Sequence, residues 1–280
     1  MREAEFRRKV VEMIERAETS LPQDVVRGLR RCMRKEKSGL GRIQLKMMLE
    51  NLRLAKKNSV PICQDTGVFT FFVRGWRGLQ FDVEASIRRA VEEATEKVPL
   101  RRNLVDPLSR MMVPAGEAER QPTVHLIGSG KGEIEVELLV KGGGTENYTR
   151  LFMLRPTASK DEILRSVVGV LEEAGGKICP PVIVGVGIGG SPENALLLSK
   201  MALLRPLGRR NRETAELERK IEAAANGLGI GPMGLGGRCT VLGVHIEKAP
   251  CHTATLPVGV SFQCWVARRA RLKGMEVVEP

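Results

Sequence analysis

The sequence predicts a mixed α/β fold with a helical N-terminal portion, and three observations lead to that prediction. Apolar residues recur at helical spacing through the first 58 residues, with charged residues on the opposite face. From residue 59 onward, short apolar strands alternate with amphipathic helices. Most glycines follow residue 127, in short clusters between these segments. Without an internal repeat or long linker, we expect one domain over 1–280, divided into a helical portion 1–58 and an α/β portion 59–280.

Three helices are expected in the N-terminal portion. The first presents an apolar face made of Phe6, Val10, Met13, Ile14 and Ala17. The second follows Pro22, which suits a first helical turn, and the third spans about 42–57. Cys32 lies on the apolar stripe of the second helix, so we expect a buried core thiol there.

The α/β portion is expected to begin with a helix capped by Asp82 and to continue with a hairpin. The hairpin would join strands 123–127 and 134–140 through the glycine-rich turn 128–132. A helix ending at Gly175 follows. The remaining expected elements are a strand at 182–184, helices at 192–204 and 212–225, and strands at 240–246 and 256–265.

Composition excludes several classes of protein. The chain has 280 residues, of which 42% are hydrophobic and 28% charged, which excludes disorder, collagen and coiled coil. No apolar run approaches the roughly 18 residues of a membrane span, and the N-terminal residues lack the apolar core of a secretory signal. We therefore expect a cytoplasmic protein whose six cysteines are thiols or metal ligands rather than disulfides.

The chain is basic, with 45 Lys and Arg against 33 Asp and Glu and a net charge of +12. Such a balance suits acidic small molecules, nucleic acid or simply a solvated surface. The basic clusters at 27–37, 205–212 and 268–273 contain no aromatic residue for base stacking. Nucleic acid is therefore not the expected partner, although charge alone does not decide.

Three cysteines stand in separate motifs. Cys63 lies in PICQDTG, Cys179 in ICPP and Cys264 near the end of HTATLPVGVSFQCW, at separations of 116 and 85 residues. These distances exclude a local C-x-x-C clip and fit thiolates that the fold brings together. None lies on an amphipathic helix stripe; Cys63 and Cys179 lie in loops, and Cys264 ends a strand. Thiolates with polar neighbours and nearby backbone N–H groups suit an iron–sulfur cluster.

The segments PICQDTG, KGGGTEN, CPP with GVGIGG, GLGIGPMGLGG and HTATLPVGVSFQCW resemble the α subunit of the iron–sulfur hydro-lyases, the class I fumarases and L-tartrate dehydratases. The resemblance implies a [4Fe–4S] cluster held by Cys63, Cys179 and Cys264, with one iron open. An open iron is a Lewis acid that polarises the C–O bond of a 2-hydroxy acid. The implied reaction is reversible dehydration of a small hydroxy-dicarboxylate, malate to fumarate first, with L-tartrate as the alternative.

The resemblance also implies roles for residues around the cluster. Gln64 and Asp65 follow the first ligand directly, so Gln64 would bind substrate beside the open iron and Asp65 would act as an acid or base. His252, twelve residues before Cys264, would face the substrate as a second catalytic group. A structural histidine is the alternative interpretation of His252.

Two further positions are implied for substrate binding. Arg101 resembles the arginine that binds a substrate carboxylate, a task for which the planar guanidinium is suited. The neighbouring Arg102 leaves that choice open. Gly143 would offer its backbone N–H to the substrate, and a tight turn is the alternative explanation for it.

A second domain is implied as well, supplied by a separate β subunit that carries the other catalytic base and more basic groups for the carboxylates. The chain ends sixteen residues after Cys264, so we expect a heteromer and no activity from this chain alone. An iron without a protein ligand also predicts an oxygen-sensitive cluster.

Three competing interpretations remain. GVGIGG at 185–190 matches a dinucleotide-binding fingerprint. That fingerprint requires an acidic residue about twenty positions further on, at the end of a second strand, whereas the region 204–212 is basic. A zinc site made of Cys239, His245, Cys251 and His252 lacks the usual paired spacing, so Cys239 and Cys251 are expected to be incidental thiols. The alternative from another class is an iron-binding protein that binds nucleic acid.

Overall fold

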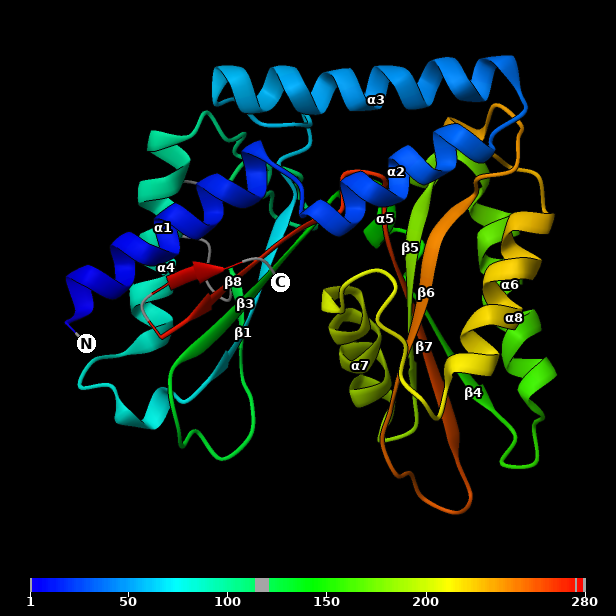
Figure 1. Ribbon diagram of the computed structural model, residues 1–280. Coiled ribbons are helices and arrows are strands. Elements are labelled where there is room, and N and C mark those ends of the chain that lie inside the picture. The colour runs from blue at the N-terminus through cyan, green and yellow to red at the C-terminus, as the bar shows by residue number, and fades with distance from the viewer. Residues whose placement is uncertain (1, 114–120, 275, 279–280) are drawn as a thin grey trace. The chain divides into compact units, whose positions relative to one another are not determined.

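The computed structural model describes residues 2–113, 121–274 and 276–278 and shows the predicted mixture of helices and sheets (Figure 1). The chain forms two compact units. Unit 1 comprises Met1–Pro22, Leu52–Lys141 and Arg268–Pro280, and unit 2 comprises Gln23–Asn51 and Gly142–Ala267. Within the described ranges, none of the helices has the length and apolarity needed to cross a membrane. The organisation as one catalytic domain stays a prediction.

Unit 1 is a five-stranded sheet with two helices packed against it (Figure 1). The strand order is β2-β1-β3-β8-β9, in which β1 and β2 are parallel and the other neighbours antiparallel. The strands are β1 (Val68–Arg74), β2 (Thr123–Leu126), β3 (Glu135–Lys141), β8 (Arg268–Lys273) and β9 (Glu276–Val278). The helices are α1 (Glu3–Thr19) and α4 (Val83–Lys97), and a 3₁₀ turn, η1, spans Trp76–Gly78.

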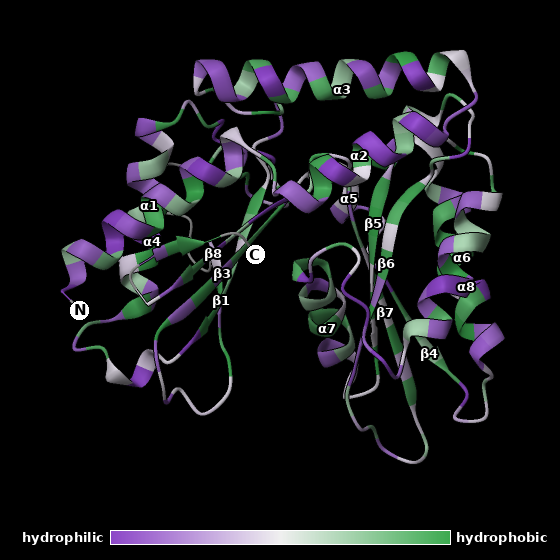
Figure 2. Cartoon of the chain, in the orientation of Figure 1, coloured by the Kyte–Doolittle hydropathy of each residue, from purple (hydrophilic) through white to green (hydrophobic). Residues whose placement is uncertain are grey.

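Local sequence signals account for both helices of unit 1. The apolar face predicted for the first helix is buried along α1 and packs with α4 and the sheet in one core. At the start of α4, Asp82 Oδ1 accepts a hydrogen bond from the backbone N–H of Ala85 at 3.0 Å, which confirms the predicted cap. Figure 2 shows the helices alternating between hydrophobic and hydrophilic residues along their length, as amphipathic helices do.

The predicted hairpin is wrong in its pairing. Both of its strands exist as β2 and β3, but β1 lies between them and pairs with each. β1 contains five consecutive buried residues, 69–73, so it is buried on both faces and suits an interior position. The mostly apolar run between Gly67 and Gly75 indicates a strand in the sequence itself, but the hairpin pattern further along the chain led to a different pairing.

Unit 2 is a four-stranded sheet with helices on both faces (Figure 1). The strand order is β4-β7-β5-β6, with β5 and β6 parallel. Helices α6 and α8 cover one face and α7 covers the other, while α2 contacts β6. The strands are β4 (Arg150–Leu154), β5 (Val182–Ile188), β6 (Val241–Lys248) and β7 (Leu256–Gln263). The helices are α2 (Gln23–Lys35), α5 (Gly143–Glu146), α6 (Lys160–Ala174), α7 (Pro192–Leu204), α8 (Ala215–Gly227), η2 (Gly175–Ile178) and η3 (Pro232–Gly234), and α3 (Gly39–Asn58) has residues in both units.

The glycines of GVGIGG have a packing role. Gly185 and Gly187 lie inside β5, not in a loop after a strand. A Cβ atom at Gly185 would collide with the carbonyl oxygen of Ser199, and one at Gly187 with that of Ala195. Both carbonyls belong to α7, so glycine here permits the close approach of helix and sheet. These two glycines need no bound dinucleotide to explain them.

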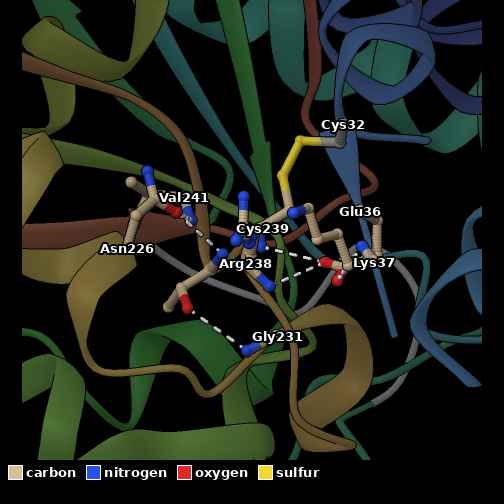
Figure 3. Close-up of a disulfide and its surroundings, with 9 residues drawn as sticks. Cys32, Glu36, Lys37, Asn226, Gly231, Arg238, Cys239 and Val241 are labelled. Carbon is tan, nitrogen blue, oxygen red and sulfur yellow. Dashed lines mark hydrogen bonds between the residues drawn. A yellow bond between two sulfur atoms is a disulfide. The ribbon is translucent and has the colours of Figure 1, made fainter. Parts of the chain in front are cut away.

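The prediction that Cys32 and Cys239 are thiols is wrong. The two residues form a disulfide between α2 and the segment before β6, with their Cα atoms 5.8 Å apart (Figure 3). Cys32 is buried, as predicted. Its pairing depends on a residue 207 positions away, which local periodicity cannot reveal.

Replacing both cysteines of this disulfide with serine is expected to lower the free energy of unfolding by about 2–4 kcal/mol, because the bond closes a very long loop in the unfolded chain. Urea unfolding measures the difference. Cys251→Ser is the control, since the Cys251 thiol is exposed and outside the disulfide. An unchanged unfolding midpoint, or six alkylatable thiols in the unreduced wild-type chain, would contradict the expectation.

Candidate functional site

The residues predicted to form the site belong to both units. Unit 1 holds the segment with Cys63, Gln64 and Asp65 and, farther along the chain, Arg101 and Arg102; unit 2 holds the other predicted residues, which are Gly143, Cys179, His252 and Cys264. Within the part of the chain that the structure describes, no group of three or more His, Cys, Asp and Glu side chains is arranged to hold a metal ion.

In unit 1, hydrogen bonds to backbone groups hold the segment around Cys63 at both ends. The N–H of Ile62 donates to the carbonyl oxygen of Glu18 at 2.9 Å. At the other end, the N–H of Gly67 donates to Asp65 Oδ1 at 2.9 Å, and Asn103 Nδ2 donates to the Gly67 carbonyl oxygen at 2.9 Å. The Cys63 thiol is half-buried and Gln64 is exposed. The segment thus presents its polar side chains from a fixed backbone.

Gly67 is required where it stands, for two reasons. Its φ angle is +76°, in the left-handed region. A Cβ atom there would also lie 2.7 Å from the carbonyl oxygen of Lys141 and 3.0 Å from Arg268 Nη2. Any other residue would push the segment away from strand β3 and from Arg268.

The structure brings Arg101 beside this segment. The N–H of Arg101 donates to Thr66 Oγ1 at 3.2 Å, and the Thr66 hydroxyl lies 3.3 Å from the Arg101 carbonyl oxygen. Thr66 follows Asp65 directly, so the arginine backbone is tied to the neighbour of the predicted acid/base group. Both Arg101 and Arg102 are exposed, and the choice between them as carboxylate ligand stays open.

Beneath the segment lies a buried ion pair that the sequence analysis missed. Arg268 Nη1 donates to Glu18 Oε2 at 2.7 Å, and the two side chains are 1% and 0% exposed. Burial raises the pKa of Glu18 to about 7; the Arg268 guanidinium opposes this rise and the Asp65 carboxylate adds to it. A signal existed, because Glu18 stands four residues after Ile14, on the apolar face of α1.

In unit 2, Cys179 and Cys264 come from neighbouring segments. Cys179 follows η2 with φ +51°, and its carbonyl oxygen accepts a hydrogen bond from the N–H of Trp265 at 3.2 Å. Trp265 comes directly after Cys264, so the backbone bond joins the two cysteine-bearing segments. Both cysteines are half-buried and outside the disulfide.

His252 is an exposed side chain in the turn between β6 and β7. Its Nδ1 accepts a hydrogen bond from the N–H of Ala254 at 3.1 Å, so a neutral ring carries its proton on Nε2. His245 is different: it is buried, with Nδ1 3.1 Å from the carbonyl oxygen of Ala202. The role of a structural histidine therefore suits His245 better than His252.

Gly143 is the first residue of the one-turn helix α5, and it is exposed. The carbonyl oxygen of Gly143 accepts the N–H of Asn147 at 3.1 Å, which closes the turn. The turn interpretation is thus compatible with this geometry, and substrate binding by the Gly143 N–H stays a prediction.

Comparison with known proteins covers nearly the whole chain. The sequence model of the family described as "Fumarate hydratase (Fumerase)" matches residues 7–273. A protein of Methanocaldococcus jannaschii named "Putative L(+)-tartrate dehydratase subunit alpha" is 42% identical over 269 residues, which are 93% of this chain and 94% of that protein. The "L(+)-tartrate dehydratase subunit alpha" of Escherichia coli strain UTI89 is 39% identical over 91% of this chain and 86% of its own length, as is that of strain K12.

Proposed function

This chain belongs to the fumarate hydratase (Fumerase) family, and on that premise we propose that it is the α subunit of a hydro-lyase that removes water from a small hydroxy-dicarboxylate. The observation that carries the proposal is similarity over more than nine-tenths of the chain to proteins named as α subunits. Those names favour L-tartrate as the substrate. Malate and fumarate, which the sequence analysis expected first, are the second candidate because of the family's description.

The residues proposed to hold a [4Fe–4S] cluster are Cys63, Cys179 and Cys264. Two observations support this set: all three are half-buried thiols outside the disulfide, and the segments of Cys179 and Cys264 are joined in unit 2. Soft thiolate ligands suit an iron–sulfur cluster. When bound, such a cluster would supply a Lewis acid for the hydroxyl and carboxylate groups of the substrate.

The remaining chemistry is assigned to side chains of this chain. We assign proton transfer to Asp65, whose carboxylate is oriented by the N–H of Gly67. His252 would donate from Nε2 to a substrate oxygen, because its Nδ1 is already engaged as an acceptor. The guanidinium of Arg101 would bind a substrate carboxylate through two parallel hydrogen bonds. Gln64 and the N–H of Gly143 would complete substrate binding.

A partner chain is part of the proposal. The relatives are named as α subunits, so we propose that a separate β subunit completes the active site and that this chain is inactive alone. We also propose a cytoplasmic location, where an oxygen-sensitive cluster is protected from oxidants. The alternative of an iron-binding protein for nucleic acid loses its support, because membership of an enzyme family explains the same motifs.

The chain, purified anaerobically together with its β subunit, is expected to convert L-tartrate to oxaloacetate with a kcat/KM at least tenfold above that for malate. Oxaloacetate is measured by its reduction with NADH in the presence of malate dehydrogenase, and fumarate by its ultraviolet absorbance. The α chain alone is the control and should give neither product. A preference for malate would replace tartrate by the second candidate, and turnover of neither acid by the cluster-loaded complex would contradict the proposed function.

A further inference from the structure

The buried pair Glu18–Arg268 stands out because an ion pair contributes little to the stability of a core. The free energy needed to remove two charges from water is about as large as the free energy gained from their attraction, so apolar residues at such positions often give equal stability. Neighbouring residues of unit 1 such as Ala17, Val140 and Ala270 are apolar and buried, and Lys141 and Arg269 are buried beside them. A charged pair inside this core therefore calls for a role other than stability.

Both members of the pair contact the segment 62–67. Glu18 binds it through the backbone, because its carbonyl oxygen accepts the N–H of Ile62 at 2.9 Å. Arg268 reaches the other end, where its Nη2 lies 3.0 Å from the position that a Cβ atom on Gly67 would occupy. The bond between Glu18 Oε2 and Arg268 Nη1 thus links the residue that accepts the Ile62 N–H to the residue that lies beside Gly67.

The strands of unit 1 fix where Arg268 stands. It opens β8, opposite Val140 of β3, and β3 in turn pairs Lys141 with Val68, the first residue of β1. Asp65, inside the supported segment, contributes electrostatically to the environment of Glu18. The pair is therefore connected to the segment through backbone, packing and charge.

From this arrangement we propose that Glu18 and Arg268 are positioning residues that hold the segment 62–67, and with it Cys63, Gln64 and Asp65, in one conformation before any ligand binds. Preorganised groups avoid the cost of ordering at the moment of binding or reaction. The inference rests on the proposed function only for the roles of the three presented side chains; the ordering of the segment is a property of the chain itself.

Hydrogen exchange of the α chain without cluster or partner tests the ordering directly. In Arg268→Met and in the double variant Glu18→Gln/Arg268→Met, peptides covering 60–68 are expected to exchange at least tenfold faster than in the wild type. Peptides from α1 and α4 should change less than threefold. Arg268→Lys keeps the positive charge but has a single Nζ in place of the two guanidinium nitrogens, so it should restore protection of 60–68 only in part.

Arg74→Met is the matched control, because Arg74 pairs with Glu137 at 2.6 Å at the opposite end of β1. It should leave exchange in 60–68 unchanged. Unchanged exchange in the Arg268 variants would overturn the proposal. Uniformly faster exchange throughout unit 1, or failure of both Arg268→Met variants to fold, would also overturn it, because the pair would then merely support the core. If the wild-type complex dehydrates neither acid, the proposed function fails while hydrogen exchange still decides the positioning role.

Discussion

Cys264→Ala is expected to reduce bound iron and sulfide from about four of each per chain to less than one, and to abolish dehydratase activity with the β subunit. The physical reason is that a cluster held by only three thiolates has no spare protein ligand when one is removed. The measurement is anaerobic reconstitution with iron and sulfide, followed by counting both per chain.

Cys251→Ala is the matched control for this prediction. Cys251 is an exposed thiol outside the disulfide, thirteen residues from Cys264, and its Sγ donates to the carbonyl oxygen of Thr255 at 3.2 Å. It should keep its iron, sulfide and activity. Full iron content in Cys264→Ala, or zinc in place of iron in the wild type, would contradict the proposed ligand set.

Glu36→Ala is expected to lower the free energy of unfolding by about 3–5 kcal/mol, the largest stability effect that we expect from a single substitution in unit 2. The Glu36 carboxylate is buried and accepts four backbone N–H bonds of 2.8–3.1 Å. Figure 3 shows Lys37, Arg238 and Cys239 among these donors. Two of the bonds come from Lys37 and Ser38, which follow α2, and two from Arg238 and the disulfide residue Cys239. Alanine would leave all four donors without their acceptor. Urea unfolding at pH 7 measures the loss.

The same carboxylate predicts an acid dependence of stability. Burial alone would raise the pKa of Glu36, but the four N–H donors outweigh it and hold the pKa below its usual value. The ionised group therefore stabilises the fold above the carboxyl pKa of the unfolded chain, about 4.3, and this contribution is lost as the pH falls through the lower folded value. Glu36→Gln should weaken the loss of stability below pH 4.

Glu213→Gln serves as the control for the unfolding measurement at pH 7, because Glu213 is exposed and pairs with Lys248 at the surface. It should change the free energy of unfolding by less than about 0.5 kcal/mol. Equal stability of the Glu36 and Glu213 variants at pH 7, or parallel pH profiles of wild type and Glu36→Gln, would contradict this account of the carboxylate.

Elements with strong local signals were predicted well. The helix 192–204 has its predicted bounds in α7, and the glycine predicted to end the helix before it is the C-cap of α6. The strands β6 and β7 start within one residue of their predicted positions. Periodicity, caps and glycines act within a few residues of each other, so they can be read from the chain directly.

Pairing across the sequence could not be predicted in this way. β1 separates β2 from β3 although a glycine-rich turn joins their ends, and Cys32 meets Cys239 across 207 residues. Both outcomes depend on which buried surfaces pack together, and a local sequence pattern does not contain that information. The same limit hid Arg268 as the partner of Glu18.

For the candidate site, the sequence alone indicated three candidate ligand cysteines and the motif residues around them, and these motifs led to the family. The tertiary structure decided that Thr66 ties down Arg101, that Trp265 joins the segments of Cys179 and Cys264, and that a buried ion pair supports the segment 62–67. The division has a physical reason. A motif records which chemical groups are present, whereas their positions depend on burial and hydrogen bonds between residues far apart in the chain.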